Sequence, residues 1–444
     1  MRKIFQLVPF LLLIALNGQA QSNTADAGDD QTEPVALPTG RVKTNMLNAN
    51  VTLVNFYDSN YLSTNNNRQG NFNWFILPQF AVAQTRPRVD WAFTYSPTIL
   101  VDRRVGSNDM FAHNVGFDLH YRFTRRLTLG LHENLRVETH LLDRLTQPTP
   151  PPTDSGLLDQ PNELVLPPAA RRTYEDAGVD LSYSLDRYTT VGISGIFDQA
   201  RFRDLADQAP LTGSLIDSQI GGGRVFLNRR ITRSQTIGVT YQLHTFLFQG
   251  GQARAITHSV LYTHSIAFTP RSSLSFFAGP EFSRIHNQIL VSLNLFPFIA
   301  QFTVNTLSTP ISFNGGATYQ WQGDRTVLLG TLANQVSDSG GLFGASQFRA
   351  ATGEIRRQLA PRWKAGLNVS YGTTSTLGLN PSSSSTMLSA NTFLSRALAE
   401  HVSVEFRYGR LHQIGYATSV VFNPADHNLF YVSLTYQFTR PLGL

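Results

Sequence analysis

The chain has 444 residues, a formal net charge of +6 and no cysteine, and only 15% of its residues are charged, against roughly 25% in ordinary soluble domains. Nearly all of the positive charge is arginine, because only three lysines occur (Lys3, Lys43 and Lys364). The arginines are scattered, without a basic run or a stacking motif, which argues against nucleic-acid binding. The lack of cysteine excludes a disulfide framework and a lipoprotein anchor.

Residues 1–20 predict a secretory signal peptide. Arg2 and Lys3 precede a short apolar core at 5–16, and Gly18-Gln19-Ala20 supplies the small residues that a signal peptidase requires. We expect cleavage before Gln21. The polar stretch 21–44 is predicted to be a flexible periplasmic leader. No run approaches the ~20 apolar residues of a membrane-spanning helix, so any membrane must be crossed by strands.

Long strands with alternating faces follow the leader. From Phe111 every second residue is almost always apolar or aromatic, and the residues between them are polar or small, which is the period of a β-strand. The alternation restarts at Leu127 after a turn at 124–126. Similar strands are predicted at 47–57, 72–83, 89–101, 111–123, 127–137, 177–185, 189–197 and 428–438.

The connections alternate between short turns and longer loops, and the short turns nearly all carry arginine. These arginines either bind lipid phosphates or are simply solvated. The predicted turns are Thr85-Arg86-Pro87, Thr124-Arg125-Arg126, Asp186-Arg187, Asn228-Arg229-Arg230, Pro270-Arg271, Gly323-Asp324-Arg325, Pro361-Arg362 and Ser395-Arg396. The longer loop 286–308 is apolar, and a tall hairpin turning at Phe296-Pro297-Phe298 is the preferred interpretation.

These features predict an all-β fold, a transmembrane antiparallel up-and-down β-barrel at 45–438 with about 18 strands, 16 being the alternative, and a tail at 439–444. The predicted strands exceed the ~5–6 residues of globular strands and suffice for the ~9–11 that cross a bilayer. A secreted soluble sandwich or solenoid is the less favoured alternative. An even strand number would leave both ends on the side of the short turns.

The layout resembles bacterial outer-membrane β-barrels of the porin type, with a signal peptide, long strands, short periplasmic turns and longer outside loops. The chain is also similar, more distantly, to uncharacterised barrels encoded beside exopolysaccharide export genes. The resemblance implies a location in the outer membrane among its lipids, and assembly by the barrel-assembly machinery. In the last strand Tyr436 and Phe438 resemble the terminal signal that this machinery reads, although six residues follow Phe438.

One face of the strands is predicted to line a hydrated pore, and the other to face lipid. The predicted pore-lining residues are Asp90, Asp118, His120, Arg122, His132, Arg136, Asp176, Asp180, Glu281, Lys364, Glu405 and Arg407. With Asp198, which shares their face, they make seven acids against four bases. Glu133 and His264 fit badly, because both fall on the lipid row. Either they lie near a rim or a bulge shifts the register.

No motif for catalysis, a metal or a cofactor is found. The sequence lacks G-x-S-x-G and H-E-x-x-H. Asp118 is expected to face His132 across two strands, which is half of a catalytic triad, but no serine is assigned beside them. The favoured function is therefore a passive or weakly selective channel for small hydrophilic solutes. A structural or export barrel working with polysaccharide partners is the alternative, and a barrel-embedded hydrolase comes third; monomer and oligomer both remain open.

Overall fold

The computed structural model describes residues 45–61, 65, 68–102, 110–138, 171–203, 215–248, 253–295, 298–338, 344–377, 384–416 and 425–441. All of them belong to one compact unit, Pro34–Leu444. The predicted signal peptide and leader lie outside the described residues. Among the described residues, no helix is long and apolar enough to span a membrane.

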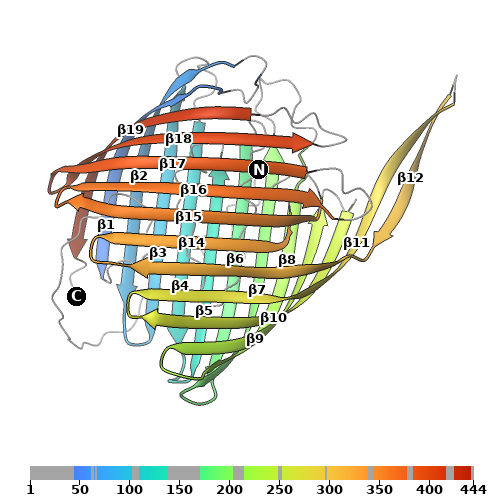
Figure 1. Ribbon diagram of the computed structural model, residues 1–444, viewed down its shortest axis with the longest axis horizontal. Helices are drawn as coiled ribbons and strands as arrows, with labels where there is room; N and C mark the ends of the chain where they lie inside the picture. Colours follow the sequence, from blue (N-terminus) through green and yellow to red (C-terminus); the bar gives the residue numbers. More distant parts are fainter. Residues whose placement is uncertain are drawn as a thin grey trace, which may run out of the picture. The chain divides into compact units, whose positions relative to one another are not determined.

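The described chain is almost entirely β-strand (Figure 1). The strands are β1 (Met46–Asp58), β2 (Asn71–Thr85), β3 (Val89–Asp102), β4 (Met110–Arg122), β5 (Leu127–Glu138), β6 (Arg171–Ser184), β7 (Thr189–Arg203), β8 (Ser218–Arg230), β9 (Gln235–Phe248), β10 (Ala253–Thr269), β11 (Ser272–Leu295), β12 (Phe298–Ser308), β13 (Ile311–Gln322), β14 (Thr326–Ser337), β15 (Ser346–Ala360), β16 (Trp363–Thr376), β17 (Ser384–Ala399), β18 (Val402–Tyr416) and β19 (Ala425–Pro441). Part of the predicted tail at 439–444 therefore belongs to the last strand.

The sheet closes on itself. Consecutive strands pair antiparallel, except that β13 pairs with β11 rather than with β12, and β1 pairs with β19 from Met46↔Pro441 to Asp58↔Leu429. Closure removes the two edges that an open sheet would leave, and in lipid an unpaired backbone group costs several kcal/mol. The predicted up-and-down barrel is confirmed.

One hairpin extends beyond the wall. The first part of β11 pairs with β13, and its second part, Ile285–Leu295, pairs with β12. β12 and β13 thus follow one another along the same side of β11 and occupy one position in the wall. The 19 strands therefore form 18 wall positions, as predicted. The β11–β12 hairpin stands out in Figure 1, which confirms the predicted tall hairpin; 296–297 lie outside the described residues.

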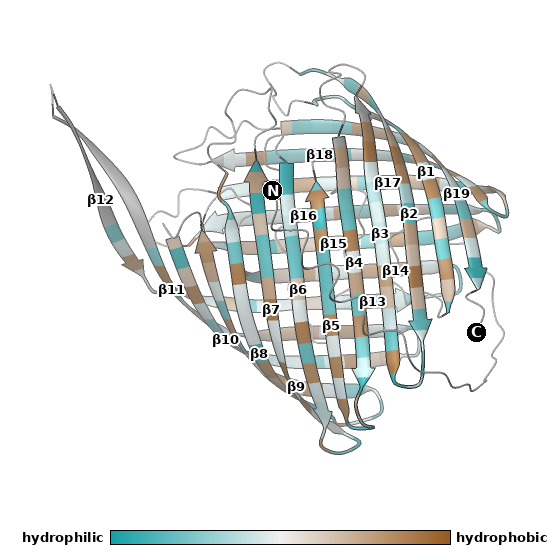
Figure 2. Cartoon of the chain, turned by 180° about the vertical axis from the view of Figure 1, so that it is seen from behind, coloured by the Kyte–Doolittle hydropathy of each residue, from teal (hydrophilic) through white to brown (hydrophobic). Residues whose placement is uncertain are grey.

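The two faces of the wall differ in chemistry. On β19 the side chains of Phe430, Val432, Leu434, Tyr436 and Phe438 are all 45–53% exposed, and they alternate with less exposed, mainly polar residues. Figure 2 shows the same alternation of hydrophobic and hydrophilic bands along the other strands. A closed wall with an apolar outer face and a polar inner face is a transmembrane barrel.

The short turns are held by local side-chain acceptors. Asp186 accepts hydrogen bonds from the backbone N–H groups of Tyr188 (2.6 Å) and Thr189 (2.8 Å). The Thr124 hydroxyl accepts from the N–H groups of Arg126 and Leu127 in the same way. Asp and Thr are frequent in turns because they offer this alternative to a ladder bond.

Two predicted turns were placed wrongly. β8 continues through Asn228-Arg229-Arg230 and turns at 231–234, and β17 continues through Ser395-Arg396 and turns at 400–401. In both cases the arginine lies within the last residues of a strand, Arg230 at the end of β8 and Arg396 three residues before the end of β17. A charged residue is cheap there, because its cost on the outer face falls toward the membrane surface.

The hydrogen-bond ladder of the wall is interrupted between β2 and β3. Pairing runs from Asn73↔Asp102 to Ile76↔Ile99 and resumes at Phe80↔Tyr95. In the unchanged register Pro78 faces Pro97 across this proline gap. Proline has no N–H to donate to a ladder, so two opposed prolines explain the gap.

A second interruption lies at the loop end of β13 and β14. Their pairing begins only at Gly315↔Asn334, which leaves 311–314 of β13 and 335–337 of β14 unpaired with each other. The Asn334 side-chain amide donates to the Phe313 carbonyl at 2.7 Å, at the point where the strands separate. We call this separation the β13–β14 seam.

Candidate pore and lumen wall

Cross-strand partners share a face, and one continuous inner row runs through three of the twelve predicted pore-lining residues. This row contains Asp90, His120, Gly130, Asp180, Ser194 and Arg224, from β3 to β8. That the twelve residues line an open pore stays a prediction.

An ion-pair network occupies the β6–β8 part of this row. The Arg224 Nη2 atom lies 2.9 Å from Asp180 Oδ1, and Arg224 Nε donates to the Ser194 hydroxyl at 2.9 Å. Ser194 in turn donates to Asp180. Arg224 was missed from the sequence, because β8 is rich in glycine and its alternation is weak.

The predicted Asp118–His132 pair exists as a register pair, but it does not form a catalytic triad. His132 Nε2 lies 3.5 Å from Asp176 Oδ1. Its ring covers Gly178, where a Cβ atom would come within 2.0 Å of the imidazole. Within the described strands, His132 has no hydrogen bond to a serine or threonine hydroxyl. The arrangement is that of a polar lumen wall.

A buried charged cluster lies near the loop end of β5 and β6. The guanidinium groups of Arg136 and Arg172 lie 4.9 and 5.0 Å from the centre of the Tyr174 ring. Both arginines are also within 3.8 Å of Glu138. Arg172 and Glu138 were missed, because the predicted strands begin at 177 and end at 137.

The far side of the lumen wall carries alternating charges. Glu405 and Arg407 on β18 form an ion pair at 2.8 Å, and Glu354 pairs with Arg356 on β15. Beside them Lys364 on β16 lies opposite Ser395. The inner charged residues missed from the sequence include Glu138, Glu354, Arg172, Arg224 and Arg356.

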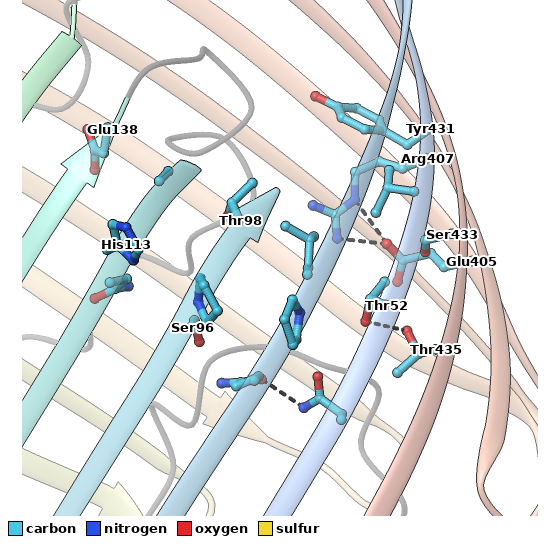
Figure 3. Close-up of a pocket in the computed structure, with 18 of the residues that line it drawn as sticks. Thr52, Ser96, Thr98, His113, Glu138, Glu405, Arg407, Tyr431, Ser433 and Thr435 are labelled. Carbon is cyan, nitrogen blue, oxygen red and sulfur yellow. Dashed lines mark hydrogen bonds and ion pairs between the residues drawn. The ribbon is translucent and has the colours of Figure 1, made fainter. Parts of the chain in front are cut away.

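A hollow opens on the inner face beside the proline gap (Figure 3). Its volume is about 140 Å³, and it is lined mainly by β18, β19 and β1 to β4. Six of its side chains carry a hydroxyl on serine or threonine, and three carry an amide. These nine residues are Thr52, Ser96, Thr98, Ser403, Ser433, Thr435, Asn50, Gln79 and Asn114.

Two hydrogen bonds across strands order the floor of the hollow. The Asn50 amide donates to Gln79 Oε1 at 2.8 Å, and the hydroxyls of Thr52 and Thr435 lie 2.9 Å apart. Asn50 Oδ1 and the Ser96 hydroxyl are buried and have no hydrogen-bond partner. On the loop side the hollow adjoins an apolar inner cluster made of Val54, Phe56, Phe75, Leu77, Leu100, Leu429 and Tyr431.

The end of β14 leans into the lumen at the β13–β14 seam. The Ser218 hydroxyl of β8 donates to Asp338 at 2.7 Å, although β8 and β14 are not neighbours in the wall. Val336 and Ala345 join an apolar cluster with Phe246 of β9 and Ile285 of β11. The inner space is therefore narrowed from this side.

The two residues that fitted the lipid row badly remain on the outer face. Glu133 is exposed opposite Phe117, in a ladder without a register shift. His264 lies between the rings of Tyr262 and Phe276, and its Nε2 atom is buried without a partner. A bulge therefore does not explain Glu133, and the only register shift of β10 is between Ala267 and Thr269.

The fold and its two faces define a transmembrane β-barrel, which places the chain in the outer membrane in contact with lipid. In the described part of the chain, no group of three His, Asp or Glu side chains is placed to hold a metal ion. Tyr436 and Phe438 lie on the outer face of β19, and their role as an assembly signal stays a prediction.

Comparison with known proteins extends no further than the fold. No family model matches the sequence, and no curated protein matches it. Similar solved structures include the outer membrane protein OpdK from Pseudomonas aeruginosa, with 12% identity, a TM-score of 0.42 and coverage of 89% of this chain and 99% of that one. OccAB4 from Acinetobacter baumannii has 11% identity and a TM-score of 0.42, with coverage of 90% of this chain and 99% of that one. The ferric citrate transporter FecA in its unliganded form has 9% identity and a TM-score of 0.44, with coverage of 90% of this chain and 79% of that one.

Proposed function

We propose that the barrel is a channel for passive or weakly selective diffusion of small hydrophilic solutes across the outer membrane. The observation that supports this is the solvent exposure of charged side chains on the inner face. The side chain of Arg122 is 51% exposed, that of His132 37% and that of Asp180 36%. A closed wall keeps inner charges exposed only where water enters, and a barrel of about 18 strands is too wide for side chains alone to fill.

The inner charges favour a slight preference for cations. Most inner arginines are paired with a carboxylate, as in Asp90–Arg122 and Asp180–Arg224. Asp118 and Asp176 instead share the imidazole of His132 as their neighbour. Because physiological salt screens charges beyond ~8 Å, the preference should be small and should fade as salt rises.

Planar bilayers test the proposal. Purified protein should give discrete openings with slight cation selectivity, and the pair Asp118→Asn/Asp176→Asn should reduce that selectivity. Asp186→Asn is the control, because it removes one carboxylate from an exposed turn outside the lumen. A silent bilayer would contradict the channel and would favour the export or structural barrel.

A further inference from the structure

The hollow beside the proline gap has the chemistry of a ligand site. Its nine hydroxyl and amide side chains can each donate and accept a hydrogen bond. Its charged lining residues are Glu138, which lies beside Arg136 and Arg172, and the Glu405–Arg407 pair. The hollow therefore offers many hydrogen bonds and little net charge.

This chemistry discriminates between classes of ligand. An anion or a cation would find its counter-charge already paired. An apolar molecule would displace the water that is hydrogen-bonded to these polar groups and would offer no hydrogen bonds in its place, which is costly. A neutral polyhydroxylated molecule matches instead, because each of its hydroxyls also donates and accepts.

Two details of the hollow support a built site. Asn50 Oδ1 and the Ser96 hydroxyl are buried and unpartnered, and both belong to the lining. Buried polar groups in proteins are rarely left without a hydrogen bond. Rotation of either side chain toward the hollow would let a ligand hydroxyl supply the missing partner.

The wall geometry provides a matching scaffold. Neighbouring strands lie about 4.8 Å apart, and alternate residues on one strand about 7 Å apart, so the side chains form a grid on the scale of a sugar ring. Val54 and Leu77 add an apolar border, against which the C–H face of a pyranose can pack. The proline gap keeps this part of the wall irregular and hollow.

We propose that this hollow binds a neutral saccharide unit during its passage along the lumen. The inference rests on the proposed channel function and names the substrate class of that channel. The residues that carry it are Asn50, Gln79 and Ser96.

The test uses the full-length protein in planar bilayers with maltotriose as the probe. Millimolar maltotriose should cause transient current interruptions, and Asn50→Ala/Gln79→Ala should shorten them at least tenfold. Asn368→Ala is the control, because Asn368 is an inner-face amide of β16 outside the hollow, and it should behave as wild type. Heat-modifiable gel migration verifies that each variant is folded.

Two results would overturn the proposal. One is equal interruptions in wild type and in the double variant. The other is equal interruptions by a polyethylene glycol of the same size, which would show that they are steric only. If the bilayer is silent without sugar, the channel proposal fails on its own; saturation-transfer NMR of maltotriose with detergent-solubilised protein then tests the hollow, and signal that is unchanged in the double variant would refute it.

Discussion

Two of the interruptions in the ladder of the wall, the proline gap and the β13–β14 seam, have opposite causes. At the proline gap the two strands keep the same register on both sides of the gap. The hydrogen-bond donors are missing there because Pro78 and Pro97 have no backbone N–H. At the β13–β14 seam the residues have normal donors and acceptors, but β14 separates from β13 while it stays paired with β15, and Asp338 beyond its end contacts Ser218 of β8.

An interruption caused by the residues of the two strands themselves thus differs in structure from one caused by a contact with a distant strand. The proline gap yields a hollow with an intact wall around it. The seam yields an unpaired stretch at one end, with Asn334 bonded to the Phe313 carbonyl at its base and the outer side chains of Ile311 and Phe313 72% and 56% exposed. Unpaired strands are costly in lipid, so the contacts that draw β14 inward must offset that cost.

The largest expected effect distinguishes a separated seam from a closed one. Continuing the β13–β14 register would place Ser312 opposite Ser337. Because the chain has no cysteine, Ser312→Cys/Ser337→Cys should remain reduced under oxidising conditions, since strands held apart cannot meet disulfide geometry. The paired positions Thr318→Cys/Thr331→Cys should cross-link more readily. Mass spectrometry of the oxidised proteins measures both, and efficient cross-linking of the first pair would show that the seam closes.

The next effect tests what holds β14 inward. Ser218→Ala removes the hydroxyl that donates to the buried Asp338 carboxylate. Loss of a hydrogen bond to a charged group costs about 1.5–3 kcal/mol, and we expect a lower free energy of unfolding in detergent together with a higher single-channel conductance. Ser370→Ala is a control, because its hydroxyl bonds Ser389 on the neighbouring strand instead. Unchanged conductance in Ser218→Ala would show that the hydrogen bond between Ser218 and Asp338 does not hold β14 inward.

A smaller effect is expected where the ladder is complete but the outer pattern is broken. Glu133 places a carboxyl group on the lipid face, where a charge costs up to roughly 2 kcal/mol for an acid. Glu133→Leu should therefore raise the free energy of unfolding by about 1 kcal/mol in lipid bilayers. Destabilisation would instead indicate that Glu133 has a partner, such as a second copy of the chain.

Replacing the two prolines of the proline gap should change the free energy of unfolding still less. Pro78→Val/Pro97→Val restores two donors, worth about 1 kcal/mol each, but it also removes a restriction of the unfolded chain worth about 0.4–1 kcal/mol per proline. These terms largely cancel. Hydrogen exchange is the sharper measurement, because the backbone amides that the substitutions create at positions 78 and 97 should be protected once the ladder can form. Rapid exchange of these two amides would mean that the prolines do not cause the gap.

The smallest effect concerns a regular turn and depends on pH. The hydrogen bonds from the Tyr188 and Thr189 N–H groups lower the pKa of the Asp186 carboxyl below its usual value near 3.8. A folded-state pKa below the unfolded one gives stability that is present above pH ~4 and is lost as pH falls through the folded pKa. The midpoint temperature of thermal unfolding should thus fall slightly less between pH 6 and pH 3 in Asp186→Asn than in the wild type. Equal slopes would show that the cap contributes nothing.

The same contrast explains what could be predicted from the sequence. The strand period fixed the two faces, since a shift by one residue would turn every apolar side chain of a strand inward. The pairing of Asp118 with His132 across β4 and β5 followed from it. The bend of β14 depends on Ser218, which lies 120 residues from Asp338, and no local pattern encodes such a contact. Arg224 and Arg172 were missed for local reasons, namely a glycine-rich strand and a strand start hidden behind a long loop.

The pairing of β1 with β19 has a consequence for biogenesis. The residues that complete the wall, from Met46↔Pro441 to Asp58↔Leu429, come from opposite ends of the barrel sequence. A chain emerging into the periplasm therefore cannot finish its barrel until nearly all of it has been translocated. Until then it carries two unsatisfied strand edges, which are templates for aggregation. The length of that interval, rather than the stability of the finished barrel alone, therefore determines how much of the chain escapes aggregation.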